Sequence, residues 1–488
     1  MARRPSLLVL TILVCCSSGG GGGGSDDEVT VIANGSITVI GSAAVTGTVW
    51  DTDDALVLFD GVEADAADLD VGMVALVEGR RSRQPGQGTA SRIEVESSVA
   101  GPIASVVDLD DDLALLGIVG RSVRVERETT LFGGTPADFD FDTMAVDDLV
   151  VVWGFVDGDE EITATRVEKR GVLGDGLPTV RLQGAAMSWM PIGSGGSFEI
   201  GDVLVLYEDT DLSGLPGGAA DLADEPFVTV DGAFDPARDE VDATRVEERA
   251  DFEGDFGDLE IEGIVSEFSG IRSRFRVGGQ RVDADFFVAL EPEDLGDFLE
   301  DGMRVEVEGS LLDGVVIAAA LKQSDAEARV SGEIAAQEDV NVVDETIALL
   351  GVTIQVDAAT RLEDERSDPV DPLTLADMMA GDHLVVRGLD TGGSVRAMLV
   401  RRTEPGDVTL RGRVQNFVGP PDHQRFTLLD HLIRTDATTV FEDFPGGVVS
   451  EIDFYTFLFA NRWALLDVTG PADDPTRLDE AAAVEYEE

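Results

Sequence analysis

The chain has 488 residues, 43% hydrophobic and 27% charged, so it has enough apolar material to fold and is too long for a single hydrophobic core. Its 97 Asp and Glu residues against 35 Lys and Arg give a formal net charge of −62. Such a surface repels phosphate backbones and anionic lipid headgroups, so we expect no nucleic-acid partner and no membrane contact except through a lipid anchor. The simplest role of the charge is solubility.

The N-terminus is typical of an export signal. Two arginines precede an apolar run over residues 7–14, which is too short to span a bilayer. The sequence LVCC that ends at Cys16 resembles a bacterial lipobox, in which the last cysteine receives diacylglycerol, so Cys16 is the predicted lipidation site. An ordinary signal peptide cleaved after a small residue near Ser18 is the alternative.

Lipidation accounts for both cysteines of the chain. Cleavage before Cys16 removes Cys15, and acylation uses the remaining thiol, so we expect no disulfide, thiolate metal site or cysteine nucleophile. The Gly- and Ser-rich residues that follow predict a flexible tether. By resemblance to Gram-negative lipoproteins, Ser17 after the modified cysteine favours anchoring in the outer membrane, on its periplasmic or surface face.

Past the tether, one pattern recurs: a strand with Val at alternate positions, a turn rich in Asp and Gly, and a second apolar strand. Its copies lie at 71–98, 147–170, 225–249, 300–323, 380–402 and, in degenerate form, 460–486. The alternation of apolar and polar residues predicts half-buried strands, and Asp-Gly at 157–158 and 313–314 predicts hairpin turns.

Two further phrases precede each hairpin. A strand that runs into a Thr and a large apolar residue occurs at 120–132, 201–212, 351–362 and 430–441, with a looser copy that lacks the Thr at 278–290. An opening Gly-x-Ile/Val occurs at Gly101, Gly263, Gly332 and Gly412, with Gly184 as the further opening glycine. A short Leu-rich bridge such as 371–382 has room for a helical turn or two. The order of three strands, a short helix and two strands is that of an OB-like barrel.

We therefore expect an all-β protein, a tandem array of about six small five-stranded OB-like β-barrel domains with short helical turns. The predicted segments are a lipoprotein signal peptide (1–15), a Gly/Ser-rich tether (16–28), and β-barrel repeats at 29–98 (divergent), 99–170, 171–250, 251–327, 328–404 and 405–488 (degenerate). The acidic stretch 251–260 is expected to be a linker that allows neighbouring barrels to swing.

The stretch 34–79, with VAGPIASV at 99–106 and LLGIVGRSVRVERETTLF at 115–132, resembles a bacterial family of exported lipoproteins with tandem small β-barrel repeats of undefined function. Those proteins carry Gly-Ser-Ile, Asp-Gly, Leu-x-x-Gly-Met-x-Val and Gly-x-Ile in this order. The resemblance is specific over 34–170 and recurs more weakly to 404. It implies the barrel fold and an envelope location, and it supplies no active-site residues.

Residues that could carry chemistry are few. The chain has three histidines, His383, His423 and His431, which match no metal-ligand spacing and are expected to be ordinary surface or turn residues. No Gly-x-Ser-x-Gly nucleophile elbow stands between a strand and a helix. We therefore predict no catalytic residue, no metal-binding residue and no cofactor.

Acidic loops and tryptophans leave two kinds of binding open. Oxygen ligands concentrate at 108–112, 138–142 and 251–260 without the EF-hand pattern, so solvated loops are expected and weak divalent-cation binding is the alternative. The four tryptophans, Trp50, Trp153, Trp189 and Trp463, could be glycan platforms, although Trp153 lies in a strand phrase and is expected in a core or at a barrel rim.

Together these features predict a non-enzymatic, lipid-anchored protein of the cell envelope, whose tandem acidic barrels act as a binding or spacer scaffold for envelope proteins or glycans. Two alternatives stay open. One is a surface module that binds divalent cations such as calcium weakly through its acidic loops. The other is an envelope hydrolase with a site that the sequence motifs do not reveal.

Overall fold

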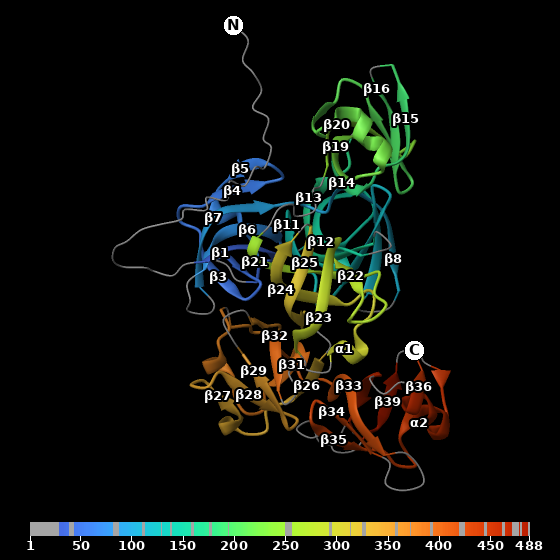
Figure 1. Ribbon diagram of the computed structural model, residues 1–488. Helices are drawn as coiled ribbons and strands as arrows, with labels where there is room; N and C mark the ends of the chain where they lie inside the picture. Colours follow the sequence, from blue (N-terminus) through green and yellow to red (C-terminus); the bar gives the residue numbers. More distant parts are fainter. Residues whose placement is uncertain are drawn as a thin grey trace. The chain divides into compact units, whose positions relative to one another are not determined.

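The computed structural model describes residues 29–38, 43–81, 87–109, 113–127, 129–136, 139–157, 161–174, 178–193, 195–248, 256–291, 295–312, 314–324, 328–356, 360–370, 372–390, 394–418, 425–443, 447–460, 464–470, 478 and 481–486. Strands make up most of these residues, with a few short helical turns between them (Figure 1). The predicted all-β class is confirmed.

The strands recur in six sets, which we name barrels 1 to 6 in chain order. Barrel 1 has β1 (Val29–Ser36), β2 (Ala43–Val45), β3 (Thr48–Asp51), β4 (Leu56–Phe59), β5 (Val62–Ala64), β6 (Val74–Arg81) and β7 (Gln87–Val95). Barrel 2 has β8 (Val99–Asp108), β9 (Leu113–Ile118), β10 (Arg121–Glu126), β11 (Leu131–Gly134), β12 (Asp148–Val156) and β13 (Ile162–Val172). Barrel 3 has β14 (Thr179–Ala185), β15 (Met187–Ile192), β16 (Gly195–Ile200), β17 (Val203–Tyr207), β18 (Asp211–Gly214), β19 (Phe227–Asp235) and β20 (Glu240–Glu248).

The second half of the chain repeats the arrangement. Barrel 4 has β21 (Phe256–Ser266), β22 (Arg274–Val277), β23 (Gln280–Glu291), β24 (Arg304–Leu312) and β25 (Val315–Gln323). Barrel 5 has β26 (Ala328–Glu333), β27 (Val340–Asn341), β28 (Thr346–Leu349), β29 (Val352–Gln355), β30 (Arg361–Asp364), β31 (His383–Asp390) and β32 (Val395–Thr403). Barrel 6 has β33 (Thr409–Val418), β34 (Arg425–Leu428), β35 (His431–Arg434), β36 (Val440–Asp443), β37 (Gly447–Val448), β38 (Leu465–Thr469) and β39 (Ala483–Tyr486).

Barrel 2 shows how the strands close. β8 pairs antiparallel with β9, and β9 with β10. β10 then runs parallel to β13, with Val123 opposite Ile162. β13 pairs antiparallel with β12, and β12 returns to β8, with Val152 opposite Val99. A ring in which the first, second, third, fifth and fourth main strands follow one another is the OB-like barrel that the sequence predicts.

In several barrels a short extra strand precedes the helical turn. The sequence pattern does not separate this extra strand from the strand before it. The extra strands β4, β11, β18 and β30 run parallel to the last strand of barrels 1, 2, 3 and 5. The recurrent Thr just before this position explains the break, because its hydroxyl donates to a main-chain carbonyl at or beside the last strand. The pairs are Thr130 to Ala164 (3.0 Å), Thr210 to Ala243 (2.8 Å), Thr360 to Ala397 (2.8 Å) and Thr439 to Ala481 (2.9 Å).

The expected helical bridges are short. They are the 3₁₀ turns η1 (Ala66–Asp68), η2 (Phe141–Thr143), η3 (Gly218–Asp224) and η5 (Leu375–Asp377), the single turn α1 (Leu295–Phe298) and the helix α2 (Glu451–Ala460), while η4 (Gln337–Asp339) lies earlier in barrel 5. α2 lies against β36 and β39, where the Phe454 ring is 4.8 Å from that of Phe441 and 5.8 Å from that of Tyr486 (Figure 1). Among the described helices, none has the length and apolarity to cross a membrane.

The opening glycines make room for an apolar residue in a hairpin turn. Val119 lies in the turn between β9 and β10 with φ +47° and is buried. A Cβ at Gly101 would lie 2.3 Å from Val119 Cγ2, and one at Gly412 would lie 3.1 Å from Leu429, which also has positive φ. The Gly-x-Ile phrase therefore marks where the first strand passes directly over this turn.

Neighbouring barrels share main-chain pairing, which corrects the expectation of swinging linkers. β14 pairs antiparallel with β8, and β33 pairs antiparallel with β26, so barrels 2 and 3 and barrels 5 and 6 are hydrogen-bonded edge to edge. The predicted linker 251–260 is also partly wrong: 251–255 lie outside the described residues, but 256–260 begin β21, where Leu259 is buried and lies opposite Ile32 of β1.

The chain divides into two compact units. The first consists of Met1–Ile261 with Gly278–Arg281 and Ser310–Val316. The second consists of Glu262–Val277, Val282–Gly309 and Ile317–Glu488. Barrels 1 to 3 therefore lie wholly in the first unit, and barrels 5 and 6 wholly in the second.

Candidate functional site

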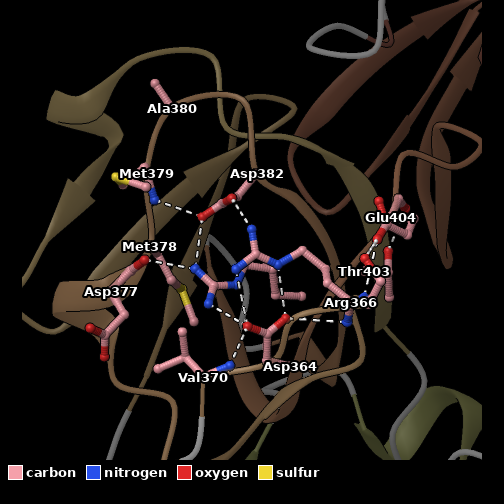
Figure 2. Close-up of polar contacts among 12 residues, drawn as sticks. Asp364, Arg366, Val370, Asp377, Met378, Met379, Ala380, Asp382, Thr403 and Glu404 are labelled. Carbon is pink, nitrogen blue, oxygen red and sulfur yellow. Dashed lines mark hydrogen bonds and ion pairs between the residues drawn. The ribbon is translucent and has the colours of Figure 1, made fainter.

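A buried cluster of two arginines and two aspartates is the most elaborate polar feature of the second unit (Figure 2). Arg402 on β32 is 1% exposed and lies beside Asp364 at the end of β30, whose side chain is 0% exposed. Arg402 Nη2 is 2.5 Å from Asp364 Oδ2, and Nη1 donates to Asp382 Oδ2 at 3.1 Å and to the carbonyl of Asp377 at 2.7 Å.

Arg366 completes this cluster from the opposite side. Its Nε donates to Asp364 Oδ1 at 2.9 Å, and its Nη1 lies 3.3 Å from Asp382 Oδ1. The backbone N–H groups of Val370 and Met379 donate to Asp364 and Asp382, each at 2.9 Å (Figure 2). Hydrogen bonds from Arg366, and then from Arg402, hold the pKa of Asp364 well below its usual range. Because both carboxylates are surrounded by protein donors, the cluster suits a structural clamp better than acid–base chemistry.

A second buried arginine connects the first three barrels. Arg181 on β14 binds Asp231 on β19 through two hydrogen bonds of 2.8 Å, from Nε and Nη2. Its Nη1 donates at 2.7 Å to Asp60, which lies in the β4–β5 turn of barrel 1. Asp60 also accepts the backbone N–H of Ser97 at 2.9 Å. Burial raises the pKa of Asp60, against the opposing charge of Arg181.

Barrels 1 and 2 also meet at Arg166 on β13. Its Nη1 donates to the carbonyl of Val71 at 2.9 Å, Nη2 binds Asp70, and Nε donates to Glu168 at 2.7 Å. The hydroxyl of the preceding Thr165 donates to the carbonyl of Gly72 at 2.6 Å. The loop before β6 is therefore fixed to the last strand of barrel 2. Together, the contacts of Arg166 and Arg181 join barrels 1, 2 and 3 within the first unit.

A hollow of about 340 Å³ lies beside this contact. Its lining is Phe59, Ala64, Asp68, Asp70, Met73, Glu168 and Arg170. The carboxylates in that set are engaged by protein groups: Asp70 and Glu168 by Arg166, and Asp68 by the backbone N–H of Asp65. Within the described ranges, no group of three or more His, Cys, Asp or Glu residues is arranged to hold a metal ion.

His383 is not the surface or turn residue that the sequence predicts. It is only 2% exposed. It starts β31 opposite Glu333 of the neighbouring strand β26, and its Nε2 lies 3.1 Å from Ser331 Oγ. The Ser331 hydroxyl also donates to the carbonyl of Asp407 at 2.9 Å. Burial lowers the pKa of His383. A serine and histidine this deeply enclosed have no access to a substrate, so the pair does not form a nucleophile site.

The remaining histidines are His431 and His423, both in the segment predicted as the sixth barrel. His431 on β35 is half-buried, with Nε2 3.0 Å from the carbonyl oxygen of Leu478. His423 lies outside the described residues.

The acidic stretches are used partly for local structure. In 138–142, Asp140 caps η2 by accepting the N–H of Thr143 at 3.0 Å, and Asp142 binds Arg127 through two hydrogen bonds of 2.8 Å. That pair accounts for the lowered pKa of Asp142. In 108–112 only the first two residues are described, and Cys16 lies outside the described residues.

The tryptophans divide into buried and surface side chains. Trp153 is buried, as expected of a core position, and Trp50 is buried against Gly79 and Gly88, where a Cβ would approach its ring to 2.5 and 2.6 Å. Trp189 on β15 is half-exposed, and its Nε1 donates to the Tyr207 hydroxyl at 2.7 Å. Trp463 lies outside the described residues.

β15 carries a surface feature that the sequence reading missed. Met187, Met190 and Ile192 are exposed to 42%, 58% and 72%. The available signal was the absence of charge from residues 182–198, in a chain of which 27% is charged. An uncharged run of this kind matches no catalytic or metal-binding motif.

Comparison with known proteins adds a domain match without a biochemical role. Residues 100–168, 262–322 and 331–401 each match the model of a family described as "Domain of unknown function (DUF5666)". These segments cover most of barrels 2, 4 and 5. No curated protein matches the chain. The chain thus contains three matches to one recurrent domain of unknown function, in an all-β protein built from tandem barrels.

Proposed function

We propose that the chain is a non-enzymatic, lipid-anchored protein of the cell envelope, whose tandem acidic barrels act as a binding or spacer scaffold for other envelope components. The anchor is the diacylglycerol-modified Cys16, and the membrane is the outer membrane of a Gram-negative bacterium. This proposal combines the lipobox and tether of the sequence with the way the barrels are joined.

The joining of the barrels is the observation that carries the scaffold role. Arg181 is clamped between Asp60 of barrel 1 and Asp231 of barrel 3, and main-chain pairing joins barrels 2 and 3 as well as barrels 5 and 6. Barrels connected only by flexible linkers would not maintain a fixed spacing between binding surfaces. Barrels joined by side-chain and main-chain contacts maintain such a spacing, and a spacer or multi-site scaffold requires it.

The way the polar clusters are used supports a role without catalysis. Arg402, Arg181 and Arg166 each bind carboxylates or carbonyls of the protein itself, and Ser331 with His383 is enclosed. Active sites instead keep a reactive group open to a substrate and poised for proton transfer. The net charge of −62 further favours protein or glycan partners over nucleic acid.

The anchor is tested by mass spectrometry of the mature N-terminus. We expect a peptide that begins at an acylated Cys16, and we expect Cys16→Ala to release the protein from the membrane fraction. An unmodified mature N-terminus that begins after Ser18 would refute the lipid anchor.

The scaffold role is tested by photo-crosslinking in intact envelopes, from exposed positions on barrels 1 to 3 and, separately, barrels 5 and 6. We expect discrete adducts with envelope proteins or glycans from more than one barrel. Absence of adducts from every position, or hydrolase activity in a broad substrate screen, would contradict the proposal. Thermal unfolding with and without millimolar calcium tests the cation-binding alternative, and we expect no shift.

A further inference from the structure

The exposed apolar side chains of barrel 3 gather on one strand. We call Met187, Trp189, Met190 and Ile192 the β15 patch. Figure 1 shows β15 and β16 side by side as a hairpin, and β15 ends the strand order of its sheet. All residues of β15 except the half-buried Trp189 are exposed. Exposed apolar residues gathered in one place mark binding surfaces more often than singly scattered ones do.

Rigid side chains support the β15 patch from beneath. Trp189 is fixed by its hydrogen bond to Tyr207, and the Tyr207 ring packs 6.1 Å from that of Phe198 in the barrel 3 core. Gly196 of β16 lets the hairpin close tightly, because a Cβ there would lie 2.4 Å from the carbonyl oxygen of Met190. Trp189, which is held in this way, loses little conformational freedom when a partner binds.

The edge of β15 is poorly suited to the addition of another strand. Pro191 has no N–H to donate, and Ser188 adopts φ +54° within a bulge between Met187 and Met190. Proline and bulges are the devices that protect edge strands from pairing with other chains. A partner is therefore bound through side-chain packing on the β15 patch and not by extension of the sheet.

The surroundings of the patch are acidic. Glu199 lies opposite Met187 in the hairpin, Glu208 follows Tyr207, and Asp224 ends η3, which contacts β15; all three carboxylates are exposed. The described cations of barrel 3 are Arg181, Arg238 and Arg245, and each is paired with Asp or Glu. The rim of the patch thus presents negative charge around an uncharged, apolar centre.

An apolar centre with a charged rim is the usual anatomy of a protein interface, and Met and Trp are enriched at such centres. We propose that the β15 patch is the docking site for a partner protein whose contact surface is apolar and surrounded by Lys and Arg. This inference rests on the proposed scaffold function and names the class of partner for one of its barrels. The acidic rim disfavours a second copy of this chain and an anionic lipid surface, since both are negatively charged.

The test measures binding of an amphipathic leucine–lysine helical peptide to the protein by fluorescence anisotropy, with the leucine–glutamate counterpart as a second probe. The variant Met187→Ser/Met190→Ser/Ile192→Ser removes the apolar centre. The matched control, Val343→Ser/Val448→Ser, removes two side chains that are 90% and 75% exposed on other barrels. We expect at least tenfold weaker binding of the lysine peptide in the first variant, no change in the control, and no binding of the glutamate peptide.

A charge variant, Glu199→Lys/Glu208→Lys, keeps the apolar centre and should weaken the lysine peptide and admit the glutamate peptide. Equal binding of the lysine peptide by all variants would overturn the inference, since it would show attraction by overall charge alone. Two other results would also overturn it: insertion of the patch into phosphatidylcholine vesicles, or sedimentation showing self-association that the triple-serine variant abolishes. If the peptide measurement contradicts the β15 docking site, crosslinks from the other barrels can still support the scaffold function. If no barrel gives crosslinks, the scaffold function fails, and the peptide measurement still reports on the β15 patch. The two proposals can therefore fail separately.

Discussion

Replacing Arg402 tests whether the buried cluster of barrel 5 stabilises the fold. In Arg402→Met the side chain keeps much of its length, but Asp364, which is 0% exposed, loses one of its two arginines, and Asp382 loses a hydrogen bond. Removing one partner of a buried ion pair typically costs about 3–5 kcal/mol, because the remaining charge stays buried. Arg366 still binds Asp364 in the variant, so we expect a loss near the lower end, about 3 kcal/mol.

The measurement is hydrogen exchange at the backbone amides of Val370 and Met379, which donate to the two aspartates of the cluster. Local exchange is the right observable because a chain of several barrels does not unfold in one cooperative step. A loss of about 3 kcal/mol corresponds to roughly 10²-fold faster exchange, since each 1.36 kcal/mol is a factor of ten.

The matched control is Arg401→Met, on the same strand. Arg401 binds Glu363 and Glu365, which are 31% and 52% exposed, so its loss should cost at most about 1 kcal/mol and accelerate exchange by roughly fivefold. Equal acceleration in the two variants would refute the reasoning, because it would show that burial adds nothing to the contribution of Arg402.

Three further predictions concern other positions. Gly101→Ala places a Cβ 2.3 Å from Val119, so it should destabilise barrel 2 by about 1–3 kcal/mol, measured by local hydrogen exchange. Adding Val119→Ala should restore much of this loss. A double variant as unstable as the single one would contradict the packing argument. Arg366 is the main cause of the lowered pKa of Asp364, so the stability that this carboxylate contributes is present above the unfolded pKa of about 3.9 and is lost as pH falls below it. Asp364→Asn should therefore remove part of the loss of stability that barrel 5 shows in acid. An unchanged dependence of stability on pH would argue against this. Burial raises the pKa of Tyr455 to about 12, so the stability that the neutral phenol contributes is present below the ordinary pKa of about 10 and is lost as pH rises through 12. Tyr455→Phe should remove the most alkaline step of phenolate absorbance. Persistence of that step would assign it to another tyrosine.

The sequence by itself determined the strands and their order. Alternating Val residues, Asp-Gly turns and the recurrent Thr are local signals, because they depend on pleat geometry, turn conformation and a hydroxyl next to the chain. They were enough to predict repeated OB-like barrels, and the closed ring of barrel 2 confirms that prediction. Trp153 was likewise placed in a core from its strand position alone.

The tertiary structure alone decided which distant residues meet. The contact between Asp60 and Arg181 spans 121 positions, and no local pattern marks the two residues as partners. His383 looked like a surface residue because polar side chains are usually exposed, yet the approach of Ser331 encloses it. Residues 256–260 looked like a linker from their composition, but pairing with β1 makes them a strand.

The β15 patch shows the same division. The sequence supplies an uncharged run at 182–198, which is compatible with a buried core strand as well as with a surface. Only the fold shows that β15 lies at the end of a sheet with its apolar side chains exposed. Periodicity and composition determine how each segment folds locally, whereas burial depends on which other segments cover it, and that is settled only when the whole chain packs.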